Sequence, residues 1–174
     1  MNTVNPSASE VCGDGIDNNC DGGAAGCGYS GAVPATSLDA LWVGGATFDY
    51  TGQSVASGGD LDGDGYDDIL VGAYGADPSS RSQAGRAYVV YGSATPTSGT
   101  FASSGATIEG ATASDYLGYS VAMVGDVNGD LYDDFIVGAY GQDALASSGG
   151  TAYLFLGGAT RRTGTIAPTA AAAS

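Results

Sequence analysis

The sequence predicts an all-β protein made of two four-stranded blades of a β-propeller. Three observations predict this fold class. The chain repeats itself once, so that Gly52 matches Gly118 and Asp60 matches Asp126. The apolar runs are of strand length, are bounded by Gly, Asp and Ser, and never follow a helical apolar period over ten residues. Finally, four such strands fit each repeat of roughly 60 residues, which is the size of a propeller blade.

The repeat is clear when the sequence is compared with itself. Gly52–Asp77 matches Gly118–Asp143, and the match continues with a slip of one residue from Ala87–Gly92 to Ala152–Gly157. A repeat of this length is typical of blades that bury their apolar faces against one another. The strands expected are 54–57, 69–71, 87–91 and the poorer 106–109 in the first unit, and 120–124, 135–137 and 152–156 in the second.

These elements divide the chain into four parts. Residues 1–28 form a head rich in Cys, Asp and Gly, 29–104 hold the first blade with a flanking strand, and 105–159 hold the second blade. Residues 160–174 end in an Ala-rich stretch and are expected to be a disordered tail.

Composition excludes many functions. The chain has 31 Gly, no Lys, no His, 17 Asp and a net charge of -15. Catalytic triads with His, imidazole metal sites and phosphate-binding lysines are excluded, and so acidic a chain is repelled by nucleic acid and by anionic membranes. No apolar stretch is long enough for a membrane helix, and the first residues do not form an export signal. The expected partners are cations, or surfaces bridged by cations.

Nine of the 17 Asp fall in two windows of nine residues, which predict metal loops. The first window places oxygen donors at positions 1, 3, 5, 7 and 9: Asp60, Asp62, Asp64, the backbone carbonyl of Tyr66, and Asp68. Such donors can converge on Ca²⁺, which takes about 6–8 oxygens, whereas Mg²⁺ needs a tighter geometry and is the weaker candidate. Gly65 at position 6 permits a sharp turn.

Two alternatives to a calcium loop can be judged on the residues. An EF-hand is excluded because position 12 needs a Glu, and here it is Val71 within an apolar run. A plain Asp/Gly turn is the other alternative, since both residue types favour turns. Five Asp in nine residues, with a second such cluster at the matching place in the repeat, favour the metal loop.

The second window predicts a weaker calcium site. Its donors are Asp126, Asn128, Asp130, Tyr132 and Asp134, with one carboxylate fewer. Leu131 stands where the first loop has Gly65. Asp67 and Asp133, at position 8 of each loop, are expected to point away as solvated charges or as outer support.

The segment from Gly52 to Ala73 resembles the FG-GAP repeat of integrin α-subunit β-propellers and their bacterial relatives. The resemblance implies blades of four antiparallel strands, with Ca²⁺ held by the same loop residues between the first two strands. The chain departs from the family at Thr51 and Leu117, which replace the Phe of Phe-Gly, and at Tyr74 and Tyr140, which replace the Pro of Gly-Ala-Pro. The resemblance also implies a closed propeller of about seven blades, whereas the repeat in this chain accounts for two.

The head resembles the MopE-type metal-binding motif of secreted bacterial proteins, over Glu10–Gly22. The resemblance implies a Cys12–Cys20 disulfide that holds Asp14, Asp17 and Asp21 together as weak candidates for a third Ca²⁺ site. A disulfide knot with solvated Asp is an equal alternative. Copper is disfavoured because the chain has no His, and Cys27 is left to pair outside the chain.

No enzyme is predicted. The adjacent Asp67 and Asp68 could suggest a glycosidase pair, but calcium ligation accounts for Asp68 and no second acid stands out. Trp42 and the 11 Tyr could form a sugar platform, but their placement in strands favours core and inter-blade packing.

The expected function is calcium-dependent adhesion, or binding of a protein or glycan, at an extracellular or bacterial cell surface. Two alternatives are an accessory module of a longer secreted enzyme, of the polysaccharide lyase or phospholipase type, and a metal-sequestering surface protein. Two blades cannot close a ring, so either chains associate head to tail or the chain is part of a longer propeller. The missing export signal favours the longer propeller.

Overall fold

The computed structural model describes residues 40–103, 105–143 and 149–166. The chain divides into two compact units, Met1–Leu38 and Asp39–Ser174, and all described residues belong to the second. The predictions for the head lie outside the described residues: Cys12, Cys20, Cys27, Asp14, Asp17 and Asp21.

The described residues form ten strands and two 3-10 turns, with no α-helix, so the all-β prediction is confirmed. None of their helices is long and apolar enough to cross a membrane. The elements are β1 (Trp42–Val43), β2 (Ser54–Gly59), β3 (Asp68–Ala73), η1 (Pro78–Ser80), β4 (Arg86–Val90), β5 (Gly99–Thr100), η2 (Phe101–Ser103), β6 (Ala106–Glu109), β7 (Leu117–Gly125), β8 (Asp134–Ala139), β9 (Thr151–Phe155) and β10 (Gly164–Ile166).

Blade 1 consists of β2, β3, β4 and β6, each antiparallel to the next. Its central strand β3 is a continuous apolar run because neighbours cover it on both sides, and Leu70 is fully buried. The fourth strand, β6, pairs with β4 through Val89 opposite Ala106. The sheet of blade 1 therefore extends past the expected boundary at residue 104. The reason is that its fourth strand lies in the second copy of the sequence repeat.

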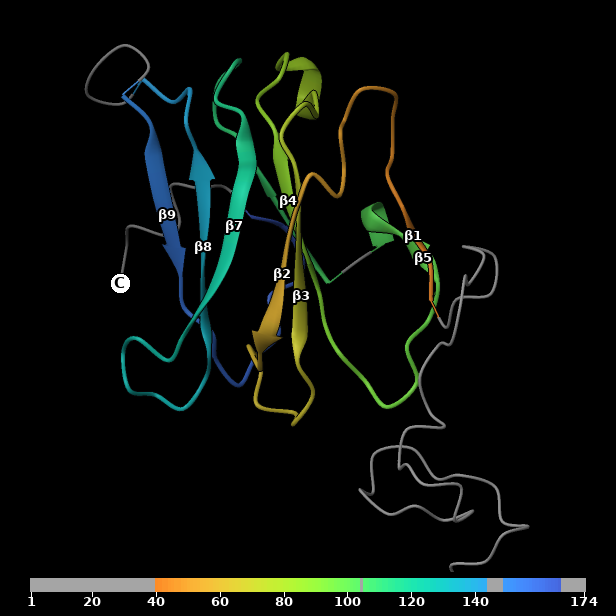
Figure 1. Ribbon diagram of the computed structural model, residues 1–174, viewed down its shortest axis with the longest axis vertical. Coiled ribbons are helices and arrows are strands. Elements are labelled where there is room, and N and C mark those ends of the chain that lie inside the picture. The colour runs from red at the N-terminus through yellow and green to blue at the C-terminus, as the bar shows by residue number, and fades with distance from the viewer. Residues whose placement is uncertain (1–39, 104, 144–148, 167–174) are drawn as a thin grey trace, which may run out of the picture. The chain divides into compact units, whose positions relative to one another are not determined.

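Blade 2 repeats the first three strands as β7, β8 and β9 (Figure 1). Ser120 lies opposite Gly138 just as Ser54 lies opposite Gly72, so the register of the first hairpin recurs in the second copy of the repeat. Both first strands also carry a register shift just before the metal loop. Within the described residues blade 2 has no fourth strand.

The two blades share one apolar core. Leu70 and Ile108 of blade 1 and Phe135, Val137 and Phe155 of blade 2 belong to a single buried cluster. The Phe135 and Phe155 rings stack at 4.9 Å between centroids. Burial of this kind stabilises each blade only where a neighbour is present.

Close backbone approach between the blades depends on glycine. A Cβ on Gly72 of β3 would lie 1.9 Å from the carbonyl oxygen of Gly118 in β7. Any side chain at Gly72 would therefore push the inner strands apart. The Oγ of Ser54 accepts a hydrogen bond from Val121 N at 3.0 Å across the same contact.

Two strand pairs are parallel, in contrast to the antiparallel pairing within each blade. β5 follows the third strand of blade 1 and pairs with β1, and β10 follows the third strand of blade 2 and pairs with β6 of blade 1. β10 lies within the segment expected to be a disordered tail. The structure differs there because Gly164–Ile166 adds to the outer edge of β6, which the sequence repeat does not reveal.

Candidate metal loops and an exposed tyrosine row

The first metal loop joins β2 to β3 and is closed by Asp60. One carboxylate oxygen of Asp60 accepts hydrogen bonds from Gly63 N (2.7 Å) and Asp64 N (3.2 Å), and the other from Gly65 N (2.9 Å). Desolvation raises the pKa of Asp60, but the backbone donors outweigh it and hold this pKa below its ordinary value. Asp60 is therefore an ionised anchor around which the loop curls.

Asp68 anchors the other end of the loop. Its carboxylate is fully buried at the start of β3 and accepts hydrogen bonds from Leu61 N and Gly92 N, both at 2.8 Å. Burial raises the pKa of Asp68, the two backbone donors oppose this, and the charges of Asp62 and Asp60 raise it further. A cation in the loop would counter this rise by favouring the ionised form.

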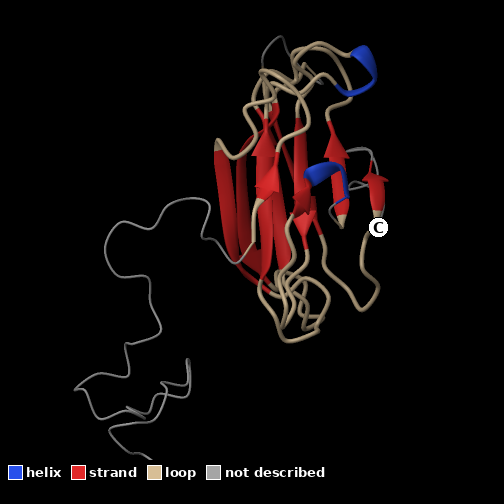
Figure 2. Ribbon diagram, turned by 90° about the vertical axis from the view of Figure 1, so that its right-hand side faces the viewer, coloured by secondary structure: helices blue, strands red, loops and turns tan. Residues whose placement is uncertain are grey.

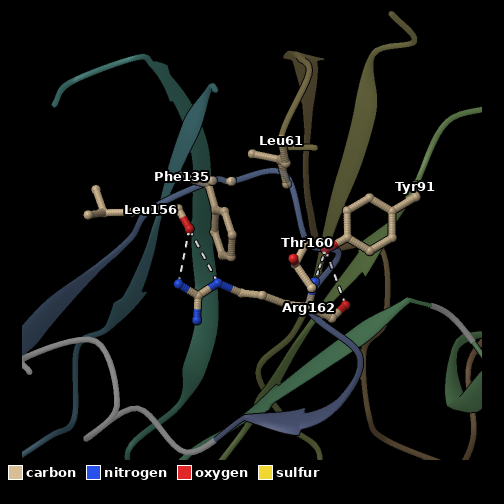
Figure 3. Close-up of a pocket in the computed structure, with 8 residues that line it drawn as sticks. Leu61, Tyr91, Phe135, Leu156, Thr160 and Arg162 are labelled. Carbon is tan, nitrogen blue, oxygen red and sulfur yellow. Dashed lines mark hydrogen bonds between the residues drawn. The ribbon is translucent and has the colours of Figure 1, made fainter. Parts of the chain in front are cut away.

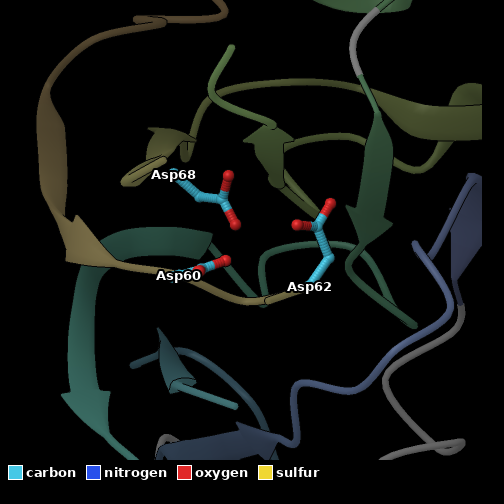
Figure 4. A group of neighbouring side chains, drawn as sticks. All are labelled: Asp60, Asp62 and Asp68. Atoms are coloured by element: carbon cyan, nitrogen blue, oxygen red, sulfur yellow. The ribbon is translucent and has the colours of Figure 1, made fainter. Parts of the chain in front are cut away.

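The loop brings three predicted ligands together. Oxygens of Asp60, Asp62 and Asp68 lie within 4.8 Å of one another (Figure 4). Asp64, a fourth predicted ligand, is not part of this group, and its Oδ1 accepts a hydrogen bond from Tyr66 N at 2.9 Å. Carboxylates at this separation repel one another unless a cation lies between them, so the cluster suggests metal binding.

Arg161 supplies a cation from the chain itself. Following β9, it forms ion pairs with Asp62 and with Asp64, the latter at 2.5 Å between Nη2 and Oδ2. Its guanidinium carbon lies 4.9 Å from the ring centroid of Tyr91. The hydrogen bond to Asp62 raises the pKa of Arg161. Sequence reasoning missed this contact because the partners are 97 and 99 residues apart.

The second loop, between β7 and β8, repeats the backbone scaffold. Asp126 accepts hydrogen bonds from Gly129 N (2.7 Å), Asp130 N (3.1 Å) and Leu131 N (2.8 Å), and these donors lower its pKa, Leu131 most. Asp134 is fully buried and accepts from Val127 N and Gly157 N.

The charged positions of the second loop differ from those of the first. Asn128 replaces Asp62, and its Nδ2 donates to Asp130 Oδ2 at 2.9 Å. Among the residues that the structure describes, three acidic groups gather within 4.8 Å only in the first loop. The second loop therefore has the scaffold of a metal loop with fewer converging charges.

Asp133 has a role that the sequence did not specify. Its carboxylate accepts a hydrogen bond from Asp60 N at 2.9 Å, and its own N–H donates to Asp60 O at 3.0 Å. Its carboxylate thus contacts the first loop, whereas a solvated charge or outer support was expected. The sequence feature that could have indicated this contact is the pair of adjacent Asp residues at positions 8 and 9 of both loops.

Five tyrosines form a partly exposed aromatic row across the two blades: Tyr50, Tyr74, Tyr116, Tyr119 and Tyr140. Tyr50 stacks on Tyr74 (5.1 Å), Tyr116 stacks on Tyr140 (4.8 Å), and Tyr119 meets the edges of Tyr74 and Tyr140. Tyr50, Tyr119 and Tyr140 are each about half exposed. The row thus crosses between blades, as expected, but it lies on the surface and not in the core.

The row and the metal loops lie at opposite ends of the strands. β2 runs from the Tyr50 turn to the first metal loop, and β3 returns from that loop to Tyr74. Loops gather at both ends of the strands when the molecule is turned (Figure 2). Trp42 does pack as predicted, 5.9 Å from Phe101 between ring centroids and beside the buried Tyr88 cluster.

Comparison with known proteins agrees with this architecture. Residues 51–90 match the FG-GAP repeat, and residues 2–25 match a motif described as "Putative metal-binding motif". Integrin alpha-PS2 of Drosophila melanogaster is 37% identical over 95 residues, an alignment that covers 52% of this chain and 7% of the integrin. The chain thus spans a small part of that relative. It carries an FG-GAP repeat, folded as β2, β3 and β4 of an all-β propeller blade, beside a second blade of the same design.

Proposed function

We propose that this chain is a non-catalytic, calcium-binding, integrin-like propeller module that binds a protein or glycan at an extracellular surface. The observation that carries the proposal is the pair of Asp loops that share one hydrogen-bond scaffold at the same end of two blades. Asp is the main acidic residue of the chain, and both loops concentrate it where a hard cation can be held.

The proposed ligands follow the loop positions. In the first loop they are Asp60, Asp62, Asp64, the Tyr66 carbonyl and Asp68, and in the second Asp126, Asn128, Asp130, the Tyr132 carbonyl and Asp134. Ca²⁺ fits better than Mg²⁺ because Ca²⁺ accepts several oxygen donors in variable geometry, whereas Mg²⁺ demands a near-ideal octahedron. In the first loop, the converging oxygens of Asp60, Asp62 and Asp68 support the proposal, and a bound cation would replace Arg161 beside Asp62 and Asp64.

The tyrosine row is the proposed partner surface. It is exposed, aromatic and uncharged on a chain of net charge -15, which suits a neutral protein or glycan surface and not a nucleic acid. Its members stack on one another, so they offer a preformed surface with little side-chain entropy left to lose.

A third metal site in the head is a further part of the proposal. The match over residues 2–25 supports metal binding there, with Asp14, Asp17 and Asp21 as ligands and a Cys12–Cys20 disulfide as the frame. Millimolar Ca²⁺ in the extracellular medium would fill such sites at the weak affinity of extracellular modules.

Calcium titration with thermal melting tests the metal proposal. We expect dissociation constants of about 10⁻⁴–10⁻³ M, and a gain of about 2.7 kcal/mol per site at a hundredfold excess over the dissociation constant. EDTA should lower the melting temperature and Ca²⁺ should restore it. Asp62→Asn should weaken the first site, whereas Asp77→Asn, outside both loops, should not. A melting curve that is the same in EDTA and in Ca²⁺ would refute the proposal.

Partner binding is tested separately with beads coated with the chain. We expect retention on an array of extracellular proteins and glycans that is lost in the double variant Tyr119→Ser, Tyr140→Ser. Equal melting temperatures of the two proteins would show that the fold is intact. Retention unchanged by the double variant would refute the role of the tyrosine row.

A further inference from the structure

The junction between the two blades is tightly filled. Leu61 and Tyr91 of blade 1 meet Phe135 and Leu156 of blade 2, and the remaining cavity measures about 10 Å³ (Figure 3). Leu61, the second residue of the first metal loop, is only 3% exposed there. A blade of this type therefore inserts the second residue of its metal loop into the next blade.

On the other face of blade 1, residues equivalent to those of blade 2 at the filled junction surround an open cavity. Ile69 and Gly92 hold the places in blade 1 that Phe135 and Gly157 hold in blade 2. The pocket there measures about 370 Å³. We name it the blade socket, and its main lining residues are Trp42, Tyr66, Asp67, Ile69, Tyr91 and Gly92.

Among the described residues, none holds at the socket the place that Leu61 holds at the filled junction. At the filled junction Leu61 and Tyr91 come from the preceding blade. At the socket, the described part of the chain supplies only Ala40 and Trp42 from that side. The volume of the socket therefore corresponds to the space that a metal-loop residue of a further blade would fill.

Backbone contacts at the filled junction define what that further blade must offer. Asp133 accepts from Asp60 N at 2.9 Å, and Gly158 N donates to Leu61 O at 2.9 Å. The matching positions lie on the two outer faces of this chain: Asp67 and Ser93 at the socket, and Asp126 and Val127 on the second loop. Val127, in the place of Leu61, is 53% exposed.

The edges of β9 and β1 match the pairing that β4 and β6 form in blade 1. Within the described residues β9 pairs only with β8, and β1 pairs only with β5. In blade 1 the corresponding edge of β4 is occupied by β6, which matches β1 in the repeat. Figure 1 shows β9 and the β1–β5 pair at opposite ends of the strand row.

Charge favours β1 as the strand that adds to β9. Where β6 lies on β4, Arg86 faces Glu109 at 3.0 Å, and Arg81 also contacts Glu109. At the matching positions β9 has Thr151 and β1 has Val43. A strand with Glu there would bring an unpaired charge to β9, whereas β1 brings none.

We propose that a second copy of this chain docks head to tail. The second loop of one copy inserts Val127 into the blade socket of the next, and β9 of the first copy pairs with β1 of the next. The proposal does not depend on which metal the loops hold.

Light scattering coupled to size exclusion tests the docking on the full chain in millimolar Ca²⁺. We expect a species heavier than the 17.0 kDa monomer, whose mass increases with protein concentration. Val127→Arg should weaken association by more than about tenfold, as a charge at a central apolar contact does. Leu131→Arg is the matched control, because Leu131 lies on the same loop, is 89% exposed and has no counterpart at the filled junction. A monomer at all concentrations, or an oligomer unaffected by Val127→Arg, would overturn the proposal.

A disulfide tests the strand pairing itself. Val43→Cys together with Thr151→Cys should give an oxidised intermolecular link, because facing residues of antiparallel strands have Cα atoms about 4.5–5.5 Å apart. Mass spectrometry should identify the peptide pair that joins positions 43 and 151, while each single variant gives no such pair. Failure of the double variant to form this link while it remains folded, as judged by circular dichroism, would contradict the docking mode.

Discussion

The two metal loops have the same backbone scaffold but different charges. In both loops the first Asp accepts three backbone hydrogen bonds and the ninth Asp is fully buried between two more. The first loop adds Asp62 and the cation Arg161, whereas the second has Asn128 and carries Leu131 at a positive φ of 74°. The scaffold therefore does not require the full set of charges.

This difference separates two roles within one motif. Positions 1 and 9 fold the loop, because their oxygens replace the backbone partners that a strand would provide. Positions 3 and 5 are both charged in the first loop, whereas in the second position 3 is neutral, so in the proposed calcium sites they would set how strongly the cation is held. Predictions about positions 1 and 9 therefore concern stability, and those about positions 3 and 5 concern affinity.

The largest effect is expected from Asp68→Ala. It leaves the N–H groups of Leu61 and Gly92 without their acceptor in a buried place, so the free energy of unfolding should fall by about 2–4 kcal/mol even in EDTA. Asp134→Ala should cost about the same, because Asp134 accepts from Val127 and Gly157 in the same way. Urea denaturation in EDTA measures both. Costs that differ by more than about 1.5 kcal/mol would show that the two scaffolds are not equivalent.

The next effect concerns calcium affinity at position 5. Asp64→Ala should weaken the first site by about 2 kcal/mol, the attraction between a dication and a carboxylate a few ångström apart in an exposed loop. Asp130→Ala should cost less at the second site, where Asn128 already leaves one carboxylate fewer. Titration calorimetry on each variant resolves the two sites. An equal or larger loss for Asp130→Ala would contradict a ranking by carboxylate count.

A smaller effect is expected from Arg161→Ala. In the proposed calcium site Arg161 would compete with the metal ion for Asp62 and Asp64, so its removal should raise calcium affinity at the first loop by about 0.2–1 kcal/mol, as for other exposed ion pairs. The second loop should not change. Arg162→Ala is the matched control, since it removes the same charge but its guanidinium contacts Leu156 O. If both variants raise affinity equally, long-range charge and not loop contact is the cause.

The sequence predicted the elements that depend on local pattern. The repeat, the three-strand core of each blade and the position of both loops follow from residues close together in the chain. It did not predict that β10 adds to β6, that Arg161 reaches the first loop or that Asp133 binds Asp60. Each of these contacts joins residues far apart in the chain, and a sequence repeat does not reveal which copy a segment will contact.

The sequence also did not predict that these tyrosines lie at the surface. Tyr74 and Tyr140 end buried strands, and aromatic residues there usually pack inward. Both stacked pairs instead begin at Tyr50 and Tyr116, which adopt positive φ values of 53° and 54° and so turn back over the strand ends. Such a conformation is rare for aromatic residues, and pattern reasoning does not anticipate it.

The smallest effect tests the one backbone difference between the loops. Leu131 has a φ of 74° and Gly65 a φ of 88° at the same loop position, and a Cβ on Gly65 would meet no atom within 4 Å. Leu131→Gly should therefore relieve strain of about 1–2 kcal/mol, less about 0.5–1 kcal/mol lost to the freer unfolded chain. Gly65→Leu should change the free energy of unfolding by a similar amount with the opposite sign. Thermal melting of both variants in EDTA measures this. Effects of the same sign would mean that the side chain of Leu131, and not its backbone, distinguishes the second loop from the first.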